Sequence, residues 1–143
     1  MRPIYQVTGA LPGTNGDCFQ ACLASVFDLS LKEVPNFMEG SQNGKLLPVE
    51  KKKELNEWLA TYRCRYLELG YNTTLDWLLP QMAAEMEDHH YLLTGRNKSY
   101  HIHTVVCRGK IVIHDPATNP GTNTIYGACH DGFYRIGIFP LVL

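Results

Sequence analysis

The sequence predicts an α+β domain in which helices come first and an antiparallel sheet follows. Apolar side chains recur at helical spacing in separate stretches between Cys18 and Met86. After Glu87 and Asp88 the pattern changes to short segments rich in β-forming residues, two of which are joined by a Gly-containing turn. Helices followed by consecutive short strands are typical of an α+β domain.

Length and composition limit the classes of function. The chain has 143 residues, of which 45% are hydrophobic and 19% charged, and its formal net charge is −1. We expect a single domain over residues 1–143, with no nucleic-acid partner and no anionic-membrane partner. No apolar run approaches the roughly 18 residues that cross a bilayer. The N-terminus has no apolar signal core, and the cysteine count of 5 is odd, so a reducing cytoplasmic compartment is favoured.

The first predicted helix begins at Cys18, after a loop over residues 8–17 that is rich in Gly, Pro, Thr and Asn. Its apolar residues follow an i, i+3, i+4 pattern, which is typical of a helix buried on one face. They are Phe19, Cys22, Leu23, Val26 and Phe27.

Two further helices are predicted before the strands. One covers residues 49–62, and the other begins near Thr73 or Thr74 and continues to Met86. Pro80 lies inside the second of these and favours a kink or two short pieces.

The predicted strands are short and rich in Val, Ile, Tyr and Thr. Arg108-Gly109 is predicted to be the turn of a hairpin. The strands cover residues 90–94, 101–107, 110–114 and 133–139.

Cys18 is the first candidate for chemistry, because a cysteine in the first turn of a helix lies at the positive end of the helix dipole, which favours the thiolate. Asp17 is placed to cap the helix through its carboxylate, which would leave the Cys18 backbone amide as an oxyanion donor. Cysteines are also often core residues, and Cys22, one turn further on, is interpreted as one. The Cys18–Cys22 spacing leaves a redox pair or half of a metal site as alternatives.

His103 is the preferred base for that cysteine, although strand alternation puts His101 on the same face. His103 is preferred because it lies near the beginning of its predicted strand, closer to the start of the helix. Asp115 follows the next strand across the predicted hairpin, where it could accept a hydrogen bond from the imidazole and orient the ring. Asp115-Pro116 is also a common signal for a turn.

Two amide side chains before Cys18 are candidate second donors to an oxyanion, Gln6 first and Asn15 second. Isolated amides of this kind are also common in turns. Histidines and cysteines outside the proposed triad are numerous enough for a zinc site, and they include His89, His90, His114, His130 and Cys129. No CxxC or HxxxH spacing occurs, so we expect no metal and no cofactor.

With these residues, the chain resembles the papain-like cysteine peptidases, and most closely small phage and bacterial proteins similar to the double-glycine leader peptidases. The resemblance rests on Gln6, residues 16–25 (GDCFQACLAS), residues 103–106 (HTVV) and residues 114–116 (HDP). It implies a papain-like fold, with the nucleophile at the start of a central helix that packs on a C-terminal antiparallel sheet. It also implies a nucleophile, a base, an orienting acid and an oxyanion-hole amide, and these roles fall on Cys18, His103, Asp115 and Gln6.

Two features depart from that family. Gln6 lies farther before Cys18 than the corresponding Gln does, and Phe19 stands where larger relatives have Gly or Trp.

The expected function is therefore that of a cysteine hydrolase, a peptidase or isopeptidase of phage type, which cleaves a peptide or protein substrate through a thioester. If the protein is viral, the host cytoplasm is its expected location. An acyltransferase or glutamine deamidase would use the same residues. A non-catalytic phage binding module on the same scaffold is the alternative outside the enzymes.

Overall fold

The computed structural model describes residues 1–6, 17–38, 47–117 and 124–142. Within these ranges the chain forms three α-helices, a short 3-10 helix and five strands. The helices are α1 (Cys18–Val26), α2 (Val49–Ala60) and α3 (Leu75–Glu85), with the 3-10 helix η1 (Leu31–Glu33) between α1 and α2. The strands are β1 (Leu67–Tyr71), β2 (His90–Arg96), β3 (Ile102–Arg108), β4 (Ile111–His114) and β5 (Tyr134–Ile138). None of the helices in the described ranges is long and apolar enough to cross a membrane.

The five strands form one antiparallel sheet in the order β1-β5-β2-β3-β4. In the β2–β3 pair, Gly95 lies opposite His103. The tight connection between β3 and β4 contains Gly109 at a φ of 57°, a left-handed conformation that favours glycine. The predicted hairpin is confirmed, but its two turn residues are Gly109 and Lys110 rather than Arg108 and Gly109, because Arg108 belongs to β3 and pairs with Ile111. The hairpin brings the residues after β4 back beside β3.

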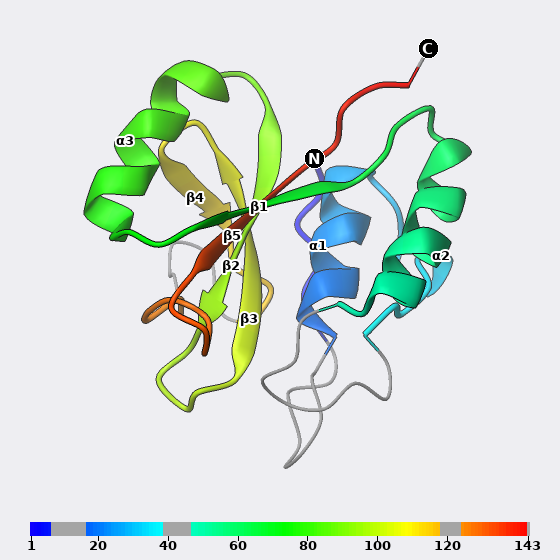
Figure 1. The fold of residues 1–143 in the computed structure, drawn as a ribbon. Coiled ribbons are helices and arrows are strands. Elements are labelled where there is room, and N and C mark those ends of the chain that lie inside the picture. The colour runs from blue at the N-terminus through cyan, green and yellow to red at the C-terminus, as the bar shows by residue number, and fades with distance from the viewer. Residues whose placement is uncertain (7–16, 39–46, 118–123, 143) are drawn as a thin grey trace.

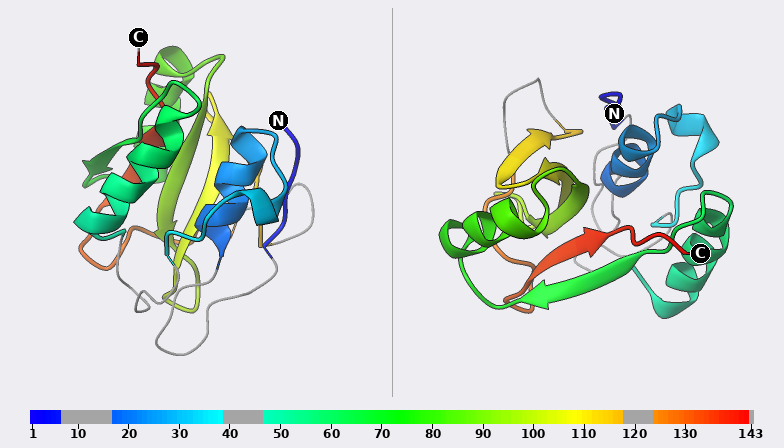
Figure 2. Two further views of the ribbon diagram at one scale, coloured as in Figure 1. Left: turned by 90° about the vertical axis from the view of Figure 1, so that its right-hand side faces the viewer. Right: turned by 90° about the horizontal axis from the view of Figure 1, so that it is seen from above.

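The sheet separates two layers of helix, with α3 on one side and α1 and α2 on the other (Figure 1; Figure 2). Residues that alternate along β2 and β3 enter two different hydrophobic cores. Leu92 and Val106 belong to the core that includes α1 and α2, whereas Leu93 and Val105 belong to the core under α3. Both faces of the central strands are therefore buried, which holds the start of β3 in a fixed position relative to α1.

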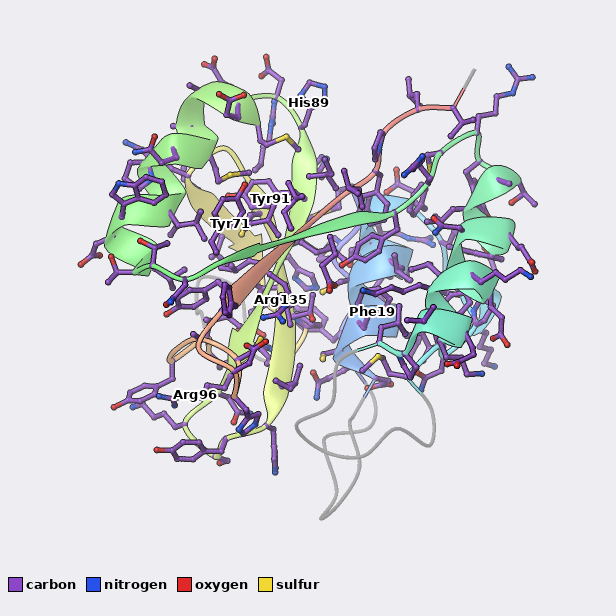
Figure 3. The ribbon with its side chains drawn as sticks, viewed as in Figure 1. Phe19, Tyr71, His89, Tyr91, Arg96 and Arg135 are labelled. Atoms are coloured by element: carbon purple, nitrogen blue, oxygen red, sulfur yellow. The ribbon has the colours of Figure 1, made fainter. Side chains whose placement is uncertain are left out.

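Aromatic side chains contribute to both cores, among them Phe19 in the core with α1 and α2 and Tyr91 in the core under α3 (Figure 3). Phe19 of α1 packs edge to face on Tyr66, with ring centroids 5.8 Å apart. On the α3 side, Tyr91 is fully buried and its hydroxyl donates to the Gly109 carbonyl at 2.5 Å. These contacts link the helix that begins at Cys18, and the turn that follows β3, to the rest of the fold.

The α+β class is confirmed, but the predicted separation of helices from strands is wrong. Strand β1 lies between α2 and α3, so the sheet is not wholly C-terminal. The sequence interpretation contains no strand there, although Leu67, Leu69 and Tyr71 alternate with Glu68 and Gly70 in the manner of a strand. The strand is at the edge of the sheet and mostly exposed, and its two leucines, Leu67 and Leu69, are 37% and 39% exposed.

The predicted helix near Thr74 is confirmed, since the Thr74 side chain accepts a hydrogen bond from the Trp77 backbone amide at 3.3 Å. That helix continues through Pro80 as one element of 11 residues, so the alternative of two short pieces is wrong.

Candidate active site

Cys18 is the first residue of α1, and this helix packs against β3. Both elements begin at the same end of the molecule, the lower end in Figure 1. The Cys18 side chain is mostly covered, with the residue 8% exposed. Cys22, one turn further, is fully buried and its thiol donates to the Thr104 carbonyl at 3.3 Å. The interpretation of Cys22 as a core residue is confirmed, and burial raises its pKa well above the usual value.

Asp17 does not cap α1 through its side chain, so this part of the prediction is wrong. Its backbone, at φ −105° and ψ 25°, is outside the extended conformation that lets an N-cap carboxylate reach the first free amides. Its carbonyl instead accepts the Ala21 amide at 3.0 Å, as the first hydrogen bond of the helix.

His103 lies in β3 and contacts Asp115, which follows β4. The Nε2 of His103 and the Oδ1 of Asp115 are 2.7 Å apart, and the two side chains are 5% and 0% exposed. The Cys18 side chain is the other partner of the imidazole, and its hydrogen bonding and Coulomb attraction help to raise the pKa of His103. Since Nε2 is used by Asp115, Nδ1 is the nitrogen left for the sulfur. The structure therefore brings Cys18, His103 and Asp115 together in one group.

Among the described residues, the Asp115 carboxylate accepts three hydrogen bonds besides that of His103. The Ala117 amide donates to Oδ1 at 2.9 Å, and the Thr124 amide and hydroxyl donate to Oδ2 at 2.6 and 2.8 Å. Burial by itself would raise the pKa of Asp115, but the bonds from His103, Thr124 and Ala117 lower it to about 2. The bond from Ala117 is also that of an Asp-initiated turn, so the turn and the contact with His103 occur together.

The charge on His103 follows from these neighbours. Burial would lower the pKa of the imidazole, but hydrogen bonds and Coulomb attraction from Asp115 and Cys18 raise it to about 10. The ring is therefore positively charged at neutral pH and held between two groups that carry or can carry negative charge. An imidazolium beside a cysteine sulfur can donate a proton to a leaving group on that side.

The structure distinguishes His103 from His101, which strand alternation had left open. His101 lies before β3, half-buried, and is held through its backbone by Asn97. The His101 amide donates to the Asn97 Oδ1 at 3.0 Å, and the His101 carbonyl accepts the Asn97 amide at 2.9 Å. His103 is the histidine that contacts Asp115.

Gln6 is brought next to this group by a bond between its amide and the Pro116 carbonyl, at 2.9 Å. Its side-chain Oε1 is buried and has no hydrogen-bond partner among the described residues. Asn15, the second candidate, lies outside the described residues. Two residues that sequence reasoning had not connected with Gln6 hold this segment: the His114 imidazole lies 2.6 Å from the Ile4 carbonyl, and Ser25 Oγ accepts the Ile4 amide at 2.9 Å. The His114 contact joins residues 110 positions apart and the Ser25 contact joins residues 21 positions apart, and no spacing in the sequence indicates either.

The cysteines are all free and buried, so Cys18 and Cys22 do not form a disulfide in this structure. Within the described ranges, no group of three or more His, Cys, Asp or Glu side chains is arranged to hold a metal ion.

No known protein family matches the chain, and comparison with curated proteins and with solved structures gives no significant match. The chemistry of the site is consequently inferred from the residues and distances given above.

Proposed function

We propose that this protein is a papain-like cysteine hydrolase, a peptidase or isopeptidase that cleaves an amide bond through a thioester on Cys18. The observation that carries the proposal is the position of His103, which is hydrogen-bonded to Asp115 at 2.7 Å and interacts with the Cys18 side chain closely enough for that side chain to raise the pKa of the imidazole. A nucleophile, a base and a group that orients the base, brought together in this order, are typical of covalent acyl-transfer catalysis.

In the proposed reaction the Cys18 thiolate adds to the carbonyl carbon of the substrate. The oxyanion of the tetrahedral intermediate accepts hydrogen bonds from the Cys18 backbone amide and the Gln6 side-chain amide. When the intermediate collapses, the C–N bond breaks, and the His103 imidazolium gives its proton to the departing amine. The neutral imidazole then takes a proton from a water molecule, which attacks the thioester and releases the acid and the thiolate.

The charges of the site suit this sequence of steps. A pKa raised to about 10 keeps His103 protonated at neutral pH, when the leaving amine needs a proton. A pKa lowered to about 2 keeps Asp115 ionised throughout, so it can hold the ring in one orientation. The proposed reaction needs no metal or cofactor, and its substrate is a peptide or protein.

An acyltransferase or a glutamine deamidase would pass through the same thioester, and the products distinguish the three activities. Hydrolysis gives a free acid and an amine, transfer gives a new amide, and deamidation gives ammonia. A non-catalytic phage binding module would give none of these products.

The experiment that tests the proposal measures how fast each cysteine reacts with iodoacetamide near neutral pH, by mass spectrometry of the digested protein. Burial raises the pKa of Cys22, Cys64, Cys107 and Cys129, so these thiols should react slowly in the folded protein. We expect Cys18 to be alkylated well ahead of the other four.

The matched variants are His103→Gln and His101→Gln, two changes of the same kind on neighbouring residues. The first should slow alkylation of Cys18 strongly, and the second should leave it close to the wild-type rate. Alkylation of Cys18 that is no faster than that of the other cysteines, or that is unchanged in His103→Gln, would contradict the proposal. Circular dichroism of each variant checks that the fold is intact.

A further inference from the structure

The segment that carries Gln6 is bonded to both elements that hold the proposed catalytic groups. This segment, residues 1–6, runs beside α1 (Figure 1). The Ile4 amide donates to the Ser25 Oγ at 2.9 Å, and the Ile4 carbonyl lies 2.6 Å from the His114 Nε2. Ser25 belongs to α1, the helix of the proposed nucleophile, and His114 ends β4, directly before the proposed orienting acid. A single residue of the segment is therefore held from both sides of the site.

The two bonds at Ile4 have defined directions. A carbonyl oxygen can only accept, so the His114 Nε2 carries the proton in its bond to Ile4. The Ser25 hydroxyl donates to the Ala21 carbonyl at 3.0 Å, which leaves its oxygen to accept the Ile4 amide. Ser25 is fully buried and His114 is 6% exposed, and the Tyr5 ring packs edge to face on the imidazole at 5.0 Å. Both side chains are thus enclosed, with one role each toward the segment.

The register of the sheet explains why His114 reaches the segment. His114 pairs with Val106 of β3, and residues paired across antiparallel strands have their side chains on the same face of the sheet. Val106 packs in the core that includes α1 and α2, and Ile4 packs against that same core. The imidazole therefore points to the side of the sheet on which α1 and the segment lie.

The bonds at Ile4 lie two residues before the proposed oxyanion donor. The Gln6 amide itself donates to the Pro116 carbonyl at 2.9 Å, and the Gln6 Oε1 is buried, so the side chain points into the protein. Donors to an oxyanion are effective when they are held in place before the reaction. The backbone that carries Gln6 is held by bonds at residues 4 and 6, and two of these bonds come from side chains.

We propose that His114 and Ser25 are positioning residues, which hold Gln6 where its side-chain amide stabilises the oxyanion. This inference rests on the proposed function, because it adds two residues to the machinery of the same site. Each acts through the backbone of Ile4 and not on the reacting atoms. The loss caused by removing either should therefore not exceed the loss caused by removing the Gln6 side chain.

The test compares two reactions of the Cys18 sulfur, of which only one passes through an oxyanion. The thiolate attacks the CH₂ carbon of iodoacetamide, where a C–S bond forms as iodide leaves. It attacks the carbonyl carbon of p-nitrophenyl acetate, and the oxyanion collapses to a thioester and p-nitrophenolate. The ratio of the acetylation rate to the alkylation rate reports the oxyanion hole, because both reactions need the same thiolate. The acetylation rate is that of the p-nitrophenol burst that is absent in Cys18→Ala.

His114→Leu removes the donor to Ile4, and Ser25→Ala removes the acceptor. Each should lower the ratio by about 10- to 100-fold, the effect of a small misplacement of a catalytic group, while alkylation stays close to the wild-type rate. His114→Gln keeps an N–H donor near the position of Nε2 and should recover most of the ratio. Tyr91→Phe is the matched control, because it also removes a buried donor from a backbone carbonyl, that of Gly109, but in the core under α3. It should lower the Tm and leave the ratio unchanged.

A double substitution shows whether His114 acts through Gln6. In Gln6→Ala the proposed donor is gone, so adding His114→Leu should cause little further loss of the ratio. A loss by the same factor with and without the Gln6 side chain would show that His114 acts by another route, and would overturn the inference.

Failure of the two proposals gives different results. If the wild type acetylates Cys18 but the ratio is unchanged in His114→Leu and Ser25→Ala, or if alkylation falls together with acetylation, the positioning inference is wrong while the hydrolase proposal stands. The same conclusion follows if Gln6→Ala keeps the wild-type ratio, or if His114→Gln recovers nothing. Circular dichroism checks the fold, and Ser25→Ala carries the test if His114→Leu does not fold. If the wild type does not acetylate Cys18, the hydrolase proposal fails, and the positioning inference fails with it.

Discussion

Replacing Asp115 with Asn tests the central contact of the site, because the change keeps the shape of the side chain and removes its charge. The carboxylate accepts bonds from His103 and Ala117 at one oxygen and from the Thr124 amide and hydroxyl at the other. An asparagine has one acceptor oxygen and one NH₂ group. Whichever way the amide is turned, its NH₂ group faces a backbone N–H, either that of Ala117 or that of Thr124.

The expected loss of stability can be estimated from these bonds. A hydrogen bond between charged groups, such as that between His103 and Asp115, contributes about 1.5–3 kcal/mol. A buried donor left without an acceptor costs about 1–3 kcal/mol. We therefore expect the free energy of unfolding to fall by about 3 kcal/mol, and the Tm of this 143-residue chain to fall by about 10 °C.

The loss should depend on pH in a direction that the two pKa shifts determine. The pKa of His103 is raised to about 10, from about 6.5 in an unfolded chain, so its contribution is complete below about pH 6.5 and disappears as the pH rises through 10. The pKa of Asp115 is lowered to about 2, so its contribution is complete above about pH 4 and is lost as the pH falls through 2. The difference between wild type and Asp115→Asn should be largest near pH 6 and smaller near pH 10.

Urea unfolding followed by circular dichroism, at several pH values between about 5 and 10, measures this difference. Asp88→Asn is the matched control, because Asp88 is 79% exposed and pairs with Arg108 at 3.3 Å on the surface. A surface pair of this kind contributes about 0–1 kcal/mol, so the control should unfold close to wild type. A loss in Asp115→Asn that is below about 1 kcal/mol, or that is the same at both ends of the pH range, would refute the reasoning.

Three other substitutions test the site and the fold around it. Gln6→Ala should reduce kcat by about 100- to 1000-fold with little change in Tm, because it removes a proposed oxyanion donor while the backbone bond to Pro116 remains. A kcat close to that of the wild type would show that Gln6 is not an oxyanion donor. Cys18→Ala should abolish formation of the thioester, seen by mass spectrometry, and should leave the Tm close to wild type; a large fall in Tm would favour a core role for this cysteine. Gly95→Ala should lower the Tm strongly, because a Cβ there would lie 2.5 Å from the Gly127 carbonyl oxygen. Gly70→Ala is the control, because a Cβ there would meet only Phe133 atoms at 3.5 Å or more, and equal Tm values for the two variants would contradict this account.

The residues of the site could be nominated from the sequence because each has a local signal. Cys18 follows a Gly-rich segment at the start of an apolar helical stripe, and Asp115 follows a strand and precedes a proline. His103 could not be separated from His101 in this way, because residues two apart on a strand share a face. The local signal at Asp17 gave a wrong prediction, because an Asp at this position favours an N-cap but its backbone takes another conformation.

The elements of the fold also divide into those that nearby residues predict and those that depend on residues far away in the sequence. The stripe of α1, the Thr74 start of α3 and the turn at Gly109 each depend on residues that are close in the sequence. The edge strand β1 depends on pairing with β5, which lies more than sixty residues away. Its alternation is short and its residues mostly exposed, so only the pairing makes it a strand.

The sequence by itself therefore determined the α+β class, the start of α1 at Cys18, the hairpin after β3 and the set of candidate residues, because all of these follow from local periodicity and turn chemistry. Only the tertiary structure decided that His103 is the histidine paired with Asp115, that Thr124 and Ala117 hold that carboxylate, and that Gln6 lies beside Pro116. These contacts depend on the register of β2, β3 and β4 and on the packing of α1 against β3. Register and packing are set by the burial of both faces of the sheet at once, and no short window of sequence contains that information.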